Sequence, residues 1–319
     1  MQAAVAIAER GLGRTANSPP VGCVIVNGGI VVGRGWTQPG GRPHAEAMAL
    51  AQAGAGAAGA TVYVTLEPCA HRSERGPACA PTLVEAGVNR VVAAVEDPDP
   101  RTSGKGFALL RDAGIDVVTG LGGADAMPVL AGFFSRIRRG RPFLTLKIAT
   151  SLDGLIAMAD GSSRWITGEA ARAHVHLERA RADAILVGSG TVRADKPKLD
   201  VRLAGLEDRN PRRIMLGSGP APEGWEVLRI PGDIGTLDCN NLLVEGGAMT
   251  ASAFLHAGLV DRLMLYRAPV LIGTGKSCLG DIGLAALDDA HGQWRLTDKR
   301  QLGKDSLEVY QRATLSKAH

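Results

Sequence analysis

The stretches Pro43-His44-Ala45-Glu46 and Pro68-Cys69, the second followed by Cys79, decide how this chain is organised. His44, Cys69 and Cys79 offer the nitrogen and sulfur atoms that zinc prefers, and three protein ligands leave a fourth position open for water. Water in such a position loses a proton near neutral pH and becomes a nucleophile. In this interpretation Glu46 does not bind the metal. It accepts protons from the water and donates them to the reacting group. The pattern therefore predicts one zinc ion per chain in a hydrolytic site of the kind that zinc deaminases use.

The spacing of His44 and Glu46 constrains the local structure. Residues two apart do not share a helix face, so the two side chains converge only where a helix begins. Pro43 and the helix-forming run at 47–51 predict such a beginning. This pattern at a helix start also arises by chance. A Pro-Cys pair directly after the apolar strand at 61–67 makes chance the weaker explanation.

Length and composition bound the class of protein. A chain of 319 residues predicts about two domains. We expect a cytoplasmic protein without a membrane partner, because no apolar run could span a bilayer and the N-terminus lacks a signal-peptide pattern. Five cysteines are an odd number, and two belong to the zinc pattern, which favours a reducing compartment. The other three, Cys23, Cys239 and Cys278, are expected to be packing residues.

The net charge of +4 is too small to indicate a nucleic-acid partner and is compatible with phosphorylated small molecules. The densest basic run consists of the arginines at 136, 138, 139 and 141. We interpret it as the solvated face of a linker rather than as a phosphate site.

Strands alternate with helices along the chain, which predicts an α/β fold. The expected strands of the first half lie at 21–26, 30–36, 61–67, 91–95 and 116–119, and those of the second half at 143–149, 184–188, 213–216, 241–244 and 262–268. Helices are expected at 5–10, 44–54, 81–86, 107–113 and 168–181. We expect a zinc-dependent deaminase domain at 1–120, a helical connector at 121–142 and a second α/β domain at 143–319.

The second half has no cluster of His and Cys, but glycine-rich turns follow two of its strands. The turns are Val244-Glu245-Gly246-Gly247 and Gly188-Ser189-Gly190-Thr191. Backbone N–H groups exposed at a helix start suit a phosphate, although such turns are also common where helices pack closely on strands. The pattern is not G-x-G-x-x-G, so a dinucleotide-binding fold of that type is not supported. With Arg179, Arg193 and Arg202 the two turns suggest a doubly phosphorylated ligand.

Eight segments, taken together and in order, carry a resemblance to a known family. They are VGCVIV at 21–26, HAE at 44–46, EPCAH at 67–71, DPDP at 97–100, KIATSLDG at 147–154, SRWIT at 163–167, the segment 191–202, and VEGG at 244–247. With them the chain resembles the bifunctional riboflavin-biosynthesis enzymes, which join a pyrimidine deaminase to a 5-amino-6-(5-phosphoribosylamino)uracil reductase. The resemblance implies a cytidine-deaminase-like α/β/α domain followed by a dihydrofolate-reductase-like α/β domain. It also implies that residues 143–319 form an NADPH-dependent reductase domain, and that the chain uses zinc, NADPH and a small phosphoribosyl pyrimidine substrate.

The resemblance assigns roles to residues of the second half. It implies that the NADPH pocket is lined by Ala149, Trp165, Thr191, Asp195, Ser218 and Gly247. It implies that the substrate is held by Ser163, Arg179, Leu199, Arg202 and Glu245. Lys147 and Asp195 are the polar groups that we consider first as the proton donor of the reduction.

Two places depart from the family pattern. Residues 70 to 78 separate the cysteines, one more than the family usually has, and the segment 72–77 replaces a Gly-Arg/Lys-Thr-Pro pattern. Ser18 stands where the family has an asparagine that is expected to touch the pyrimidine, and Asn17 is a candidate substitute. His71 matches a family histidine near the metal. It is expected to contact the substrate or one of the zinc ligands rather than the zinc ion itself, because a fourth protein ligand would close the site.

Two other functions remain open from the residues alone. A base deaminase of transfer RNA uses the same zinc set, but it needs a basic surface lined by aromatic side chains, and the aromatic content here is 4%. It also leaves the second half unexplained. A zinc-stabilised binding module has no use for a carboxylate beside the metal that does not bind it. The sequence does not determine the oligomeric state and leaves a homo-oligomer open.

Overall fold

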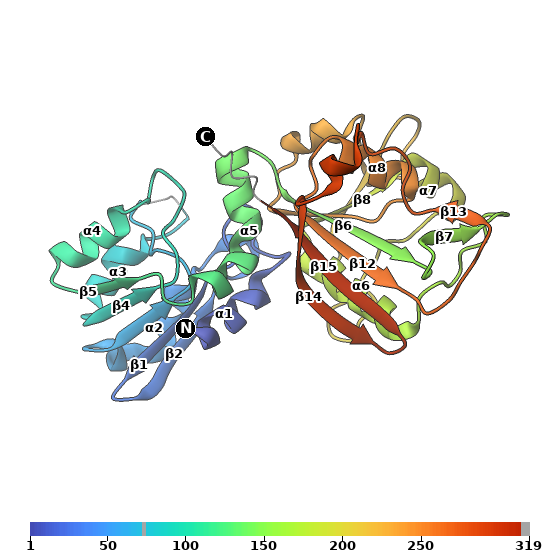
Figure 1. The fold of residues 1–319 in the computed structure, drawn as a ribbon. Helices are drawn as coiled ribbons and strands as arrows, with labels where there is room; N and C mark the ends of the chain where they lie inside the picture. Colours follow the sequence, from blue (N-terminus) through green and yellow to red (C-terminus); the bar gives the residue numbers. More distant parts are fainter. Residues whose placement is uncertain (72–74, 314–319) are drawn as a thin grey trace. The chain divides into compact units, whose positions relative to one another are not determined.

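Two β-sheets organise the chain, each within its own unit of the computed structural model (Figure 1). The structure describes residues 1–71 and 75–313. The first unit comprises Met1–Arg141 together with Asp238–Asn240, and the second comprises Pro142–Leu237 and Asn241–His319. None of the helices in the described residues is long and apolar enough to cross a membrane.

The first unit has a five-stranded sheet in the order β2-β1-β3-β4-β5. Strand β1 is antiparallel to both of its neighbours, while β3, β4 and β5 are parallel. The apolar residues of β1, β3 and β4 are buried in one core with helical residues. The strands are β1 (Gly22–Asn27), β2 (Ile30–Trp36), β3 (Thr61–Val64), β4 (Arg90–Ala93) and β5 (Asp116–Thr119).

Helices cover both faces of this sheet. A Cβ on Gly22 would lie 1.9 Å from the carbonyl oxygen of Ala4 in α1, and one on Gly35 would lie 2.1 Å from that of Ala45 in α2. Gly35 pairs with Cys23, the neighbour of Gly22, and adjacent strand residues point to opposite faces, so α1 and α2 lie on opposite faces. The helices are α1 (Gln2–Ala8), α2 (Ala45–Ala53), α3 (Cys79–Glu85), α4 (Lys105–Asp112) and α5 (Gly123–Arg139), with 3₁₀ turns at Glu9–Gly11, Pro39–Gly41 and Gly54–Ala57.

Helix α5 occupies most of the segment that was expected to connect the two halves. Its apolar side chains Ala126, Leu130, Phe133 and Phe134 are buried in the core of the first unit. Its arginines are not simply solvated. The Arg136 side chain donates to the carbonyl oxygen of Asn17 and to Oδ1 of Asn240, both at 3.2 Å.

The second unit has an eight-stranded sheet in the order β10-β9-β8-β11-β6-β12-β15-β14. The strands from β10 to β12 are parallel, and β15 and β14 complete the sheet in antiparallel fashion. These strands are β6 (Phe143–Thr150), β8 (Ala184–Gly188), β9 (Arg212–Leu216), β10 (Glu226–Leu228), β11 (Asn241–Val244), β12 (Arg262–Arg267), β14 (Trp294–Leu302) and β15 (Asp305–Arg312). A separate ribbon pairs β7 (Leu155–Met158) with β13 (Gly275–Ser277).

The helices of the second unit follow its parallel strands. They are α6 (Glu169–Arg181), α7 (Ser189–Asp195) and α8 (Ala248–His256), with 3₁₀ turns at Pro231–Thr236 and Leu287–Ala290. Because α7 and α8 start directly after the parallel neighbours β8 and β11, their N-termini lie at the same edge of the sheet. That edge is where open α/β sheets bind ligands.

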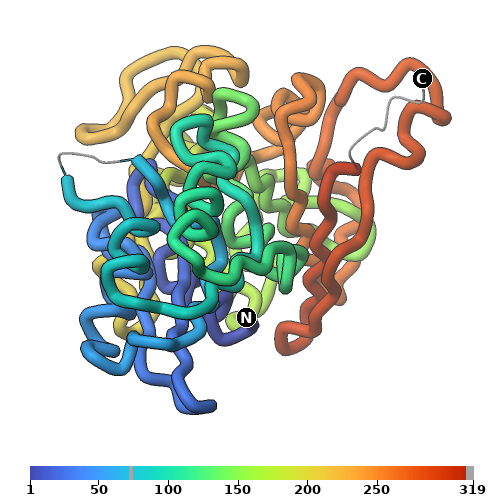
Figure 2. The backbone as a smooth tube through the Cα atoms, turned by 90° about the vertical axis from the view of Figure 1, so that its left-hand side faces the viewer, coloured from blue at the N-terminus to red at the C-terminus, as the bar shows by residue number. Residues whose placement is uncertain are grey.

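Within residues 1–71 and 75–313, the sequence pattern located most strands and helices but missed five strands. The two longest of these form the C-terminal hairpin of β14 and β15, drawn in red in Figures 1 and 2. Strand β14 reads WRLTDKRQL, and its side chains are mostly exposed or half-buried because it is the edge strand. A strand with so few buried side chains lacks the apolar alternation that a sequence prediction needs. Strands β7, β10 and β13 escaped because they are short.

Candidate functional site

The three predicted zinc ligands come together in the first unit. His44 is the residue before α2, Cys69 lies in the loop after β3, and Cys79 is the first residue of α3. Their ligand atoms all lie within 4.8 Å of one another. Nδ1 of His44 is 3.3 Å from Sγ of Cys79 and 3.6 Å from Sγ of Cys69.

This donor set fits zinc in its chemistry as well as in its spacing. Tetrahedral zinc with ligand bonds of about 2.0 to 2.3 Å places its ligand atoms roughly 3.5 Å apart, close to the separations found here. A hydrogen bond from the Cys79 thiol lowers the pKa of Cys69, and the backbone N–H of Cys79 also donates to Sγ of Cys69 at 3.3 Å. The pair therefore already favours a thiolate, the form that binds metal.

Glu46 lies beside this cluster but does not belong to it. It occupies the first turn of α2, and only 4% of its surface is exposed. Burial raises the pKa of its carboxyl, while the nearby His44 ring works in the opposite direction. A buried carboxyl of this kind, next to a metal site, is suited to take up and release protons near neutral pH.

A pocket of about 240 Å³ opens at the cluster. Besides His44, Glu46 and Cys79, it is lined by Arg42, Pro43, Ala47, Arg75, Gly76, Pro77 and Thr82. The sequence patterns had singled out neither Arg42 nor Arg75 as a site residue. The only available signal was their place beside the two halves of the zinc pattern.

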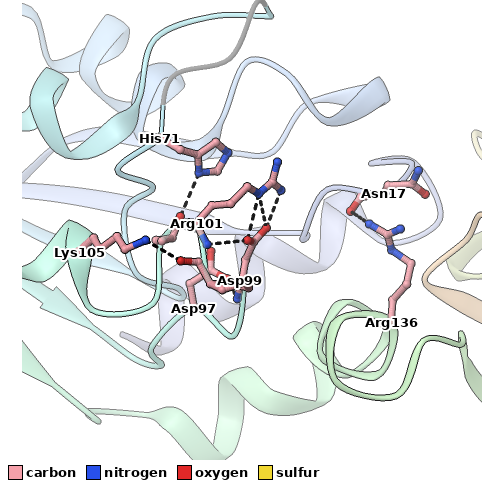
Figure 3. Close-up of polar contacts among 9 residues, drawn as sticks. Asn17, His71, Asp97, Asp99, Arg101, Lys105 and Arg136 are labelled. Atoms are coloured by element: carbon pink, nitrogen blue, oxygen red, sulfur yellow. Dashed lines mark hydrogen bonds and ion pairs between the residues drawn. The ribbon is translucent and has the colours of Figure 1, made fainter.

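His71 lies apart from the ligand cluster. Its Nδ1 is 3.1 Å from Oγ1 of Thr102, a fully buried residue of the loop before α4 (Figure 3). Among the described residues, His71 is not part of the group of possible metal ligands, which consists of His44, Cys69 and Cys79. The segment 72–77 differs from the family pattern between the two cysteines, and its first residues, 72–74, lie outside the described residues.

The two residues considered for the missing family asparagine have other surroundings. The Asn17 backbone accepts a hydrogen bond from Arg136, as Figure 3 shows. Its Oδ1 is buried and has no hydrogen-bond partner among the described residues. Ser18 lies against Gly41, where an added Cβ would be 2.2 Å from its Oγ. Neither residue is among the described residues that line the pocket.

Glu67, directly before the Pro68-Cys69 pair, organises the loop that carries Thr102. Its buried carboxylate accepts four backbone N–H groups, those of Asp97, Gly104, Gly106 and Phe107, at 2.9 to 3.2 Å. A Cβ on Gly106, in the first turn of α4, would lie 2.0 Å from the carbonyl oxygen of Pro68, so the start of α4 packs directly against the metal-ligand segment. The position of Glu67 directly after an apolar strand was a signal of this role, because a glutamate there is buried only when it has partners.

The same loop contains two further carboxylates. The Arg101 side chain holds the pKa of Asp99 below its usual range, and Figure 3 shows its two-pronged contact with that carboxylate. Burial raises the pKa of Asp97 to about 7, against the hydrogen bond that it accepts from the backbone of Asp99. Asp97 is therefore partly protonated at neutral pH, which limits the repulsion between the buried carboxylates.

We predict that Glu67→Gln loosens this loop. The amide can accept through one oxygen only and presents an NH₂ group to backbone donors, so buried N–H groups lose their partner at a cost on the order of 3 kcal/mol. Hydrogen exchange of the segment 97–107 is expected to accelerate by roughly a hundredfold. Glu96→Gln is the matched control, because Glu96 is exposed and accepts one bond from Ser103. Unchanged protection in Glu67→Gln would contradict the anchoring role.

In the second unit, the topology gathers most of the assigned cofactor residues at one sheet edge. Ala149 lies near the end of β6, Ser218 follows β9, and Gly247 is the residue before α8. Thr191 and Asp195 lie on α7, which starts at the end of β8. The strands concerned are consecutive parallel neighbours in the order β9-β8-β11-β6, so their carboxyl ends lie side by side.

In each of the two glycine-rich turns, one glycine packs closely against α8 and another borders open space. Added Cβ atoms on Gly188 and Gly246 would lie 2.3 and 2.5 Å from the side chain of Thr250 in α8, so both positions need glycine for close packing. At Gly190 and Gly247 an added Cβ would meet nothing within 4 Å. Close packing therefore accounts for Gly188 and Gly246, while Gly190 and Gly247 border open space and keep the phosphate site a prediction.

A largely buried network of charged side chains includes two of the assigned substrate residues. Arg179 of α6 makes a two-pronged contact with Glu245, with Nε and Nη2 at 2.7 and 3.0 Å from the two carboxylate oxygens. Nζ of Lys147 lies 3.8 Å from the same carboxylate. Burial lowers the pKa of Lys147, although Glu245 opposes that shift.

The remaining assigned residues lie nearer the surface, with one exception. Trp165 is 67% exposed and lies under the guanidinium of Arg172, at 4.9 Å from its ring centroid. Ser163 and Arg202 are exposed, while Leu199 is buried. Arg202 lies 3.4 Å from Asp200, and Asp195 lies 3.9 Å from Arg164.

Comparison with known proteins places both halves of the chain in described families. Residues 1–95 match the model of the cytidine and deoxycytidylate deaminase zinc-binding region, and residues 142–229 and 233–307 match the RibD C-terminal domain. The riboflavin biosynthesis protein RibD of Escherichia coli is 41% identical, with 96% of each chain covered. The chain belongs to the RibD family.

Solved structures of RibD proteins match nearly the full length of the chain. Acinetobacter baumannii RibD has a TM-score of 0.89 at 37% identity, covering 98% of this chain and 97% of that one. A diaminohydroxyphosphoribosylaminopyrimidine deaminase/5-amino-6-(5-phosphoribosylamino)uracil reductase of Thermotoga maritima has a TM-score of 0.87 at 31% identity, with the same coverage.

Membership of the RibD family confirms the predicted fold class and function. The chain is a bifunctional enzyme of riboflavin biosynthesis, with a zinc-binding deaminase domain that holds the His44, Cys69 and Cys79 cluster, and a reductase domain that implies a nicotinamide cofactor. The alternative hypothesis of a transfer-RNA base deaminase offered no function for the second half of the chain. The match of that half to the RibD C-terminal domain provides one.

Proposed function

We propose that the first unit deaminates 2,5-diamino-6-(5-phosphoribosylamino)pyrimidin-4(3H)-one by hydrolysis, and that the second reduces the product with NADPH to the ribitylamino compound. The observation that carries the first half is a buried carboxyl, Glu46, beside a ligand cluster that it does not join. A purely structural metal site has no need of such a group. The name of the Thermotoga maritima relative supports the choice of substrates.

In the first unit, His44, Cys69 and Cys79 would hold the zinc ion. Bound zinc activates water for attack on the ring carbon. Glu46 takes one proton from the attacking water at its carboxylate and gives it to the ring nitrogen. It then carries the second proton, from the hydroxyl group on the attacked carbon, to the leaving amine, which departs as ammonia. Its burial supports this role, because a raised pKa brings the carboxyl closer to the working pH.

In the second unit, the open N-terminus of α8 at Gly247 is the proposed seat of a cofactor phosphate, with Ala149, Trp165, Thr191, Asp195 and Ser218 around the same sheet edge. Bound NADPH supplies the hydride that converts the ribosyl carbon from the aldehyde to the alcohol level. Arg179, Arg202, Ser163, Leu199 and Glu245 are proposed to hold the phosphoribosyl group.

Lys147 is our first choice as the proton donor of the reduction. It is largely buried on β6, with Nζ 3.8 Å from the Glu245 carboxylate, and burial lowers its pKa, which makes it a better acid than an exposed lysine. Asp195 is the less favoured choice, because its side chain is half-exposed and lies beside Arg164. We assign deamination to residues 1–120 and reduction to residues 143–319, with 121–142 between them.

The test uses the full chain with the diamino substrate, followed by mass analysis of the products. Without NADPH, the expected product differs only by exchange of the ring amine for a carbonyl. With NADPH it gains two further hydrogens. When zinc has been removed by a chelator, the chain should still oxidise NADPH with 5-amino-6-(5-phosphoribosylamino)uracil, because no residue assigned to the reduction is a zinc ligand. A chain that binds NADPH but does not consume it with that substrate would refute the proposed reductase activity.

A further inference from the structure

Helix α6 begins without a capping side chain of its own. Its N-cap residue is Gly168, and Ala171 occupies the third helical position, from which a Glu or Gln can reach back to the N-cap N–H. Asp305, 137 positions further along the chain, provides the acceptor instead. Its Oδ2 accepts the backbone N–H of Gly168 at 2.6 Å. The start of α6 is therefore held by β15 rather than by its own sequence.

Asp305 lies at the sheet edge where the assigned cofactor residues gather. It is the first residue of β15, and the next residue, Ser306, pairs with Arg267 at the end of β12. Arg267 also pairs with Thr150 at the end of β6. Because β6 and β12 are parallel strands, Asp305 is beside their carboxyl ends.

The contact between Asp305 and Gly168 is enclosed by packing. Asp305 is 0% exposed, and its Oδ1 has no hydrogen-bond partner among the described residues. An added Cβ on Gly168 would lie 3.2 Å from Oδ2 of Asp305 and 3.6 Å from the Lys304 side chain, so a larger residue would crowd the contact. Since burying a carboxyl with one unbonded oxygen is costly, the hydrogen bond to Gly168 is the polar contact that keeps this side chain in place.

The segment 163–167, which ends at Gly168, carries the assigned cofactor residue Trp165. Arg172 in α6 fastens this segment to the helix, since its Nη1 donates to the carbonyl oxygen of Thr167 at 2.6 Å. The same guanidinium lies 4.9 Å from the centroid of the Trp165 ring, which is 67% exposed. The place of this exposed ring therefore depends on where α6 begins.

We propose that Asp305 is a positioning residue for the nicotinamide cofactor. By fixing Gly168 it holds the segment 163–167 so that Trp165 presents its ring to bound NADPH. The inference rests on the proposed NADPH-dependent reduction, and it adds a residue that contacts neither cofactor nor substrate. The competing explanation is that Asp305 only stabilises the second unit.

The test measures NADPH binding to the full chain by isothermal titration calorimetry. Asp305→Ala removes the acceptor and should weaken binding by roughly tenfold, whereas Asp305→Asn keeps an oxygen for the Gly168 N–H and should stay within about threefold of the parent. Asp288→Ala is the matched control, because Asp288 is an exposed carboxylate of the 3₁₀ turn at Leu287–Ala290. An equal loss in the Ala and Asn variants of Asp305 would show that the hydrogen bond is not what matters.

A double-mutant cycle with Trp165→Leu separates positioning from general stability. If Asp305 acts through Trp165, Asp305→Ala should add little to the loss of affinity that Trp165→Leu causes alone. If the two losses multiply, Asp305 supports the second unit in another way and the proposal is wrong.

Hydrogen exchange of the parent protein gives a readout that needs no variant to fold. Without NADPH, the Gly168 amide should exchange more slowly than the amides of 163–167, because it is bonded to Asp305. Saturating NADPH should slow exchange of the whole segment. An unprotected Gly168 amide, or a segment that NADPH leaves unchanged, would overturn the proposal. If calorimetry shows that the parent protein binds no NADPH, the proposed reduction fails first.

Discussion

Cys69→Ser is expected to remove zinc from the chain and to abolish deamination. A serine hydroxyl stays protonated at neutral pH and is a poor zinc ligand, whereas the Cys69 thiol is already inclined to ionise through its hydrogen bond with Cys79. The other two ligands, His44 and Cys79, would leave two positions open, which lowers affinity far below that of a three-ligand site. Metal content per chain, measured by elemental analysis after dialysis, checks the first part and ammonia release the second.

The control for this variant is Cys278→Ser. Cys278 is half-buried in the second unit and outside the ligand cluster, so this variant should keep zinc and deaminase activity. Cys69→Ser should also keep its NADPH oxidation with 5-amino-6-(5-phosphoribosylamino)uracil. That result would show that the variant is folded and that only the metal site has been lost. Stoichiometric zinc in Cys69→Ser would show that the ligand set is wrong.

Glu46→Gln is expected to keep zinc and to lose deamination by about a hundredfold to ten-thousandfold in kcat. The amide has the shape of the carboxyl and fits the same buried place, but it cannot take up and release a proton. Because Glu46 is not among the three ligands, metal content should stay at the parent level. Single-turnover measurement of ammonia release separates this chemical defect from slower product release.

Glu85→Gln provides the comparison for Glu46→Gln. Glu85 is an exposed glutamate at the end of α3 in the same unit, so the same chemical change there should leave kcat within a few-fold of the parent. Zinc-loaded Glu46→Gln with kcat also within a few-fold would mean that another group carries the protons. Loss of zinc in Glu46→Gln would instead show that the carboxyl stabilises the metal site itself.

Local patterns were sufficient for much of the fold because they act within one element. The exact limits of β2, β5, β8 and β11 follow from apolar runs bounded by turn residues. The start of α2 follows from Pro43 and the helix formers after Glu46, and this start brings His44 to the ligand cluster. The edge strand β14 could not be recognised in this way, because its stability comes from pairing with β15 rather than from burial of its own side chains.

The roles of residues far apart in the chain were not accessible to the same reasoning. The resemblance implies that Arg179 contacts substrate, and no local pattern indicated its two-pronged contact with Glu245, which lies 66 positions further along the chain. Glu67 accepts N–H groups from a loop that begins 30 residues later. In both cases a charge is buried, and whether a buried charge has a partner depends on which segments the fold brings beside it.

The sequence by itself determined the chemistry of this protein: a set of nitrogen and sulfur donors for zinc, an acid/base carboxyl at a helix start, and a second α/β half with glycine-rich strand ends. These features depend on residue type and on spacing within a few positions, which the chain carries in its order. Only the tertiary structure decided that Arg42 and Arg75 share a pocket with the zinc ligands and that Glu67 holds the loop beneath them. Such contacts arise from packing between segments, and their distances are set by the whole core rather than by any one stretch.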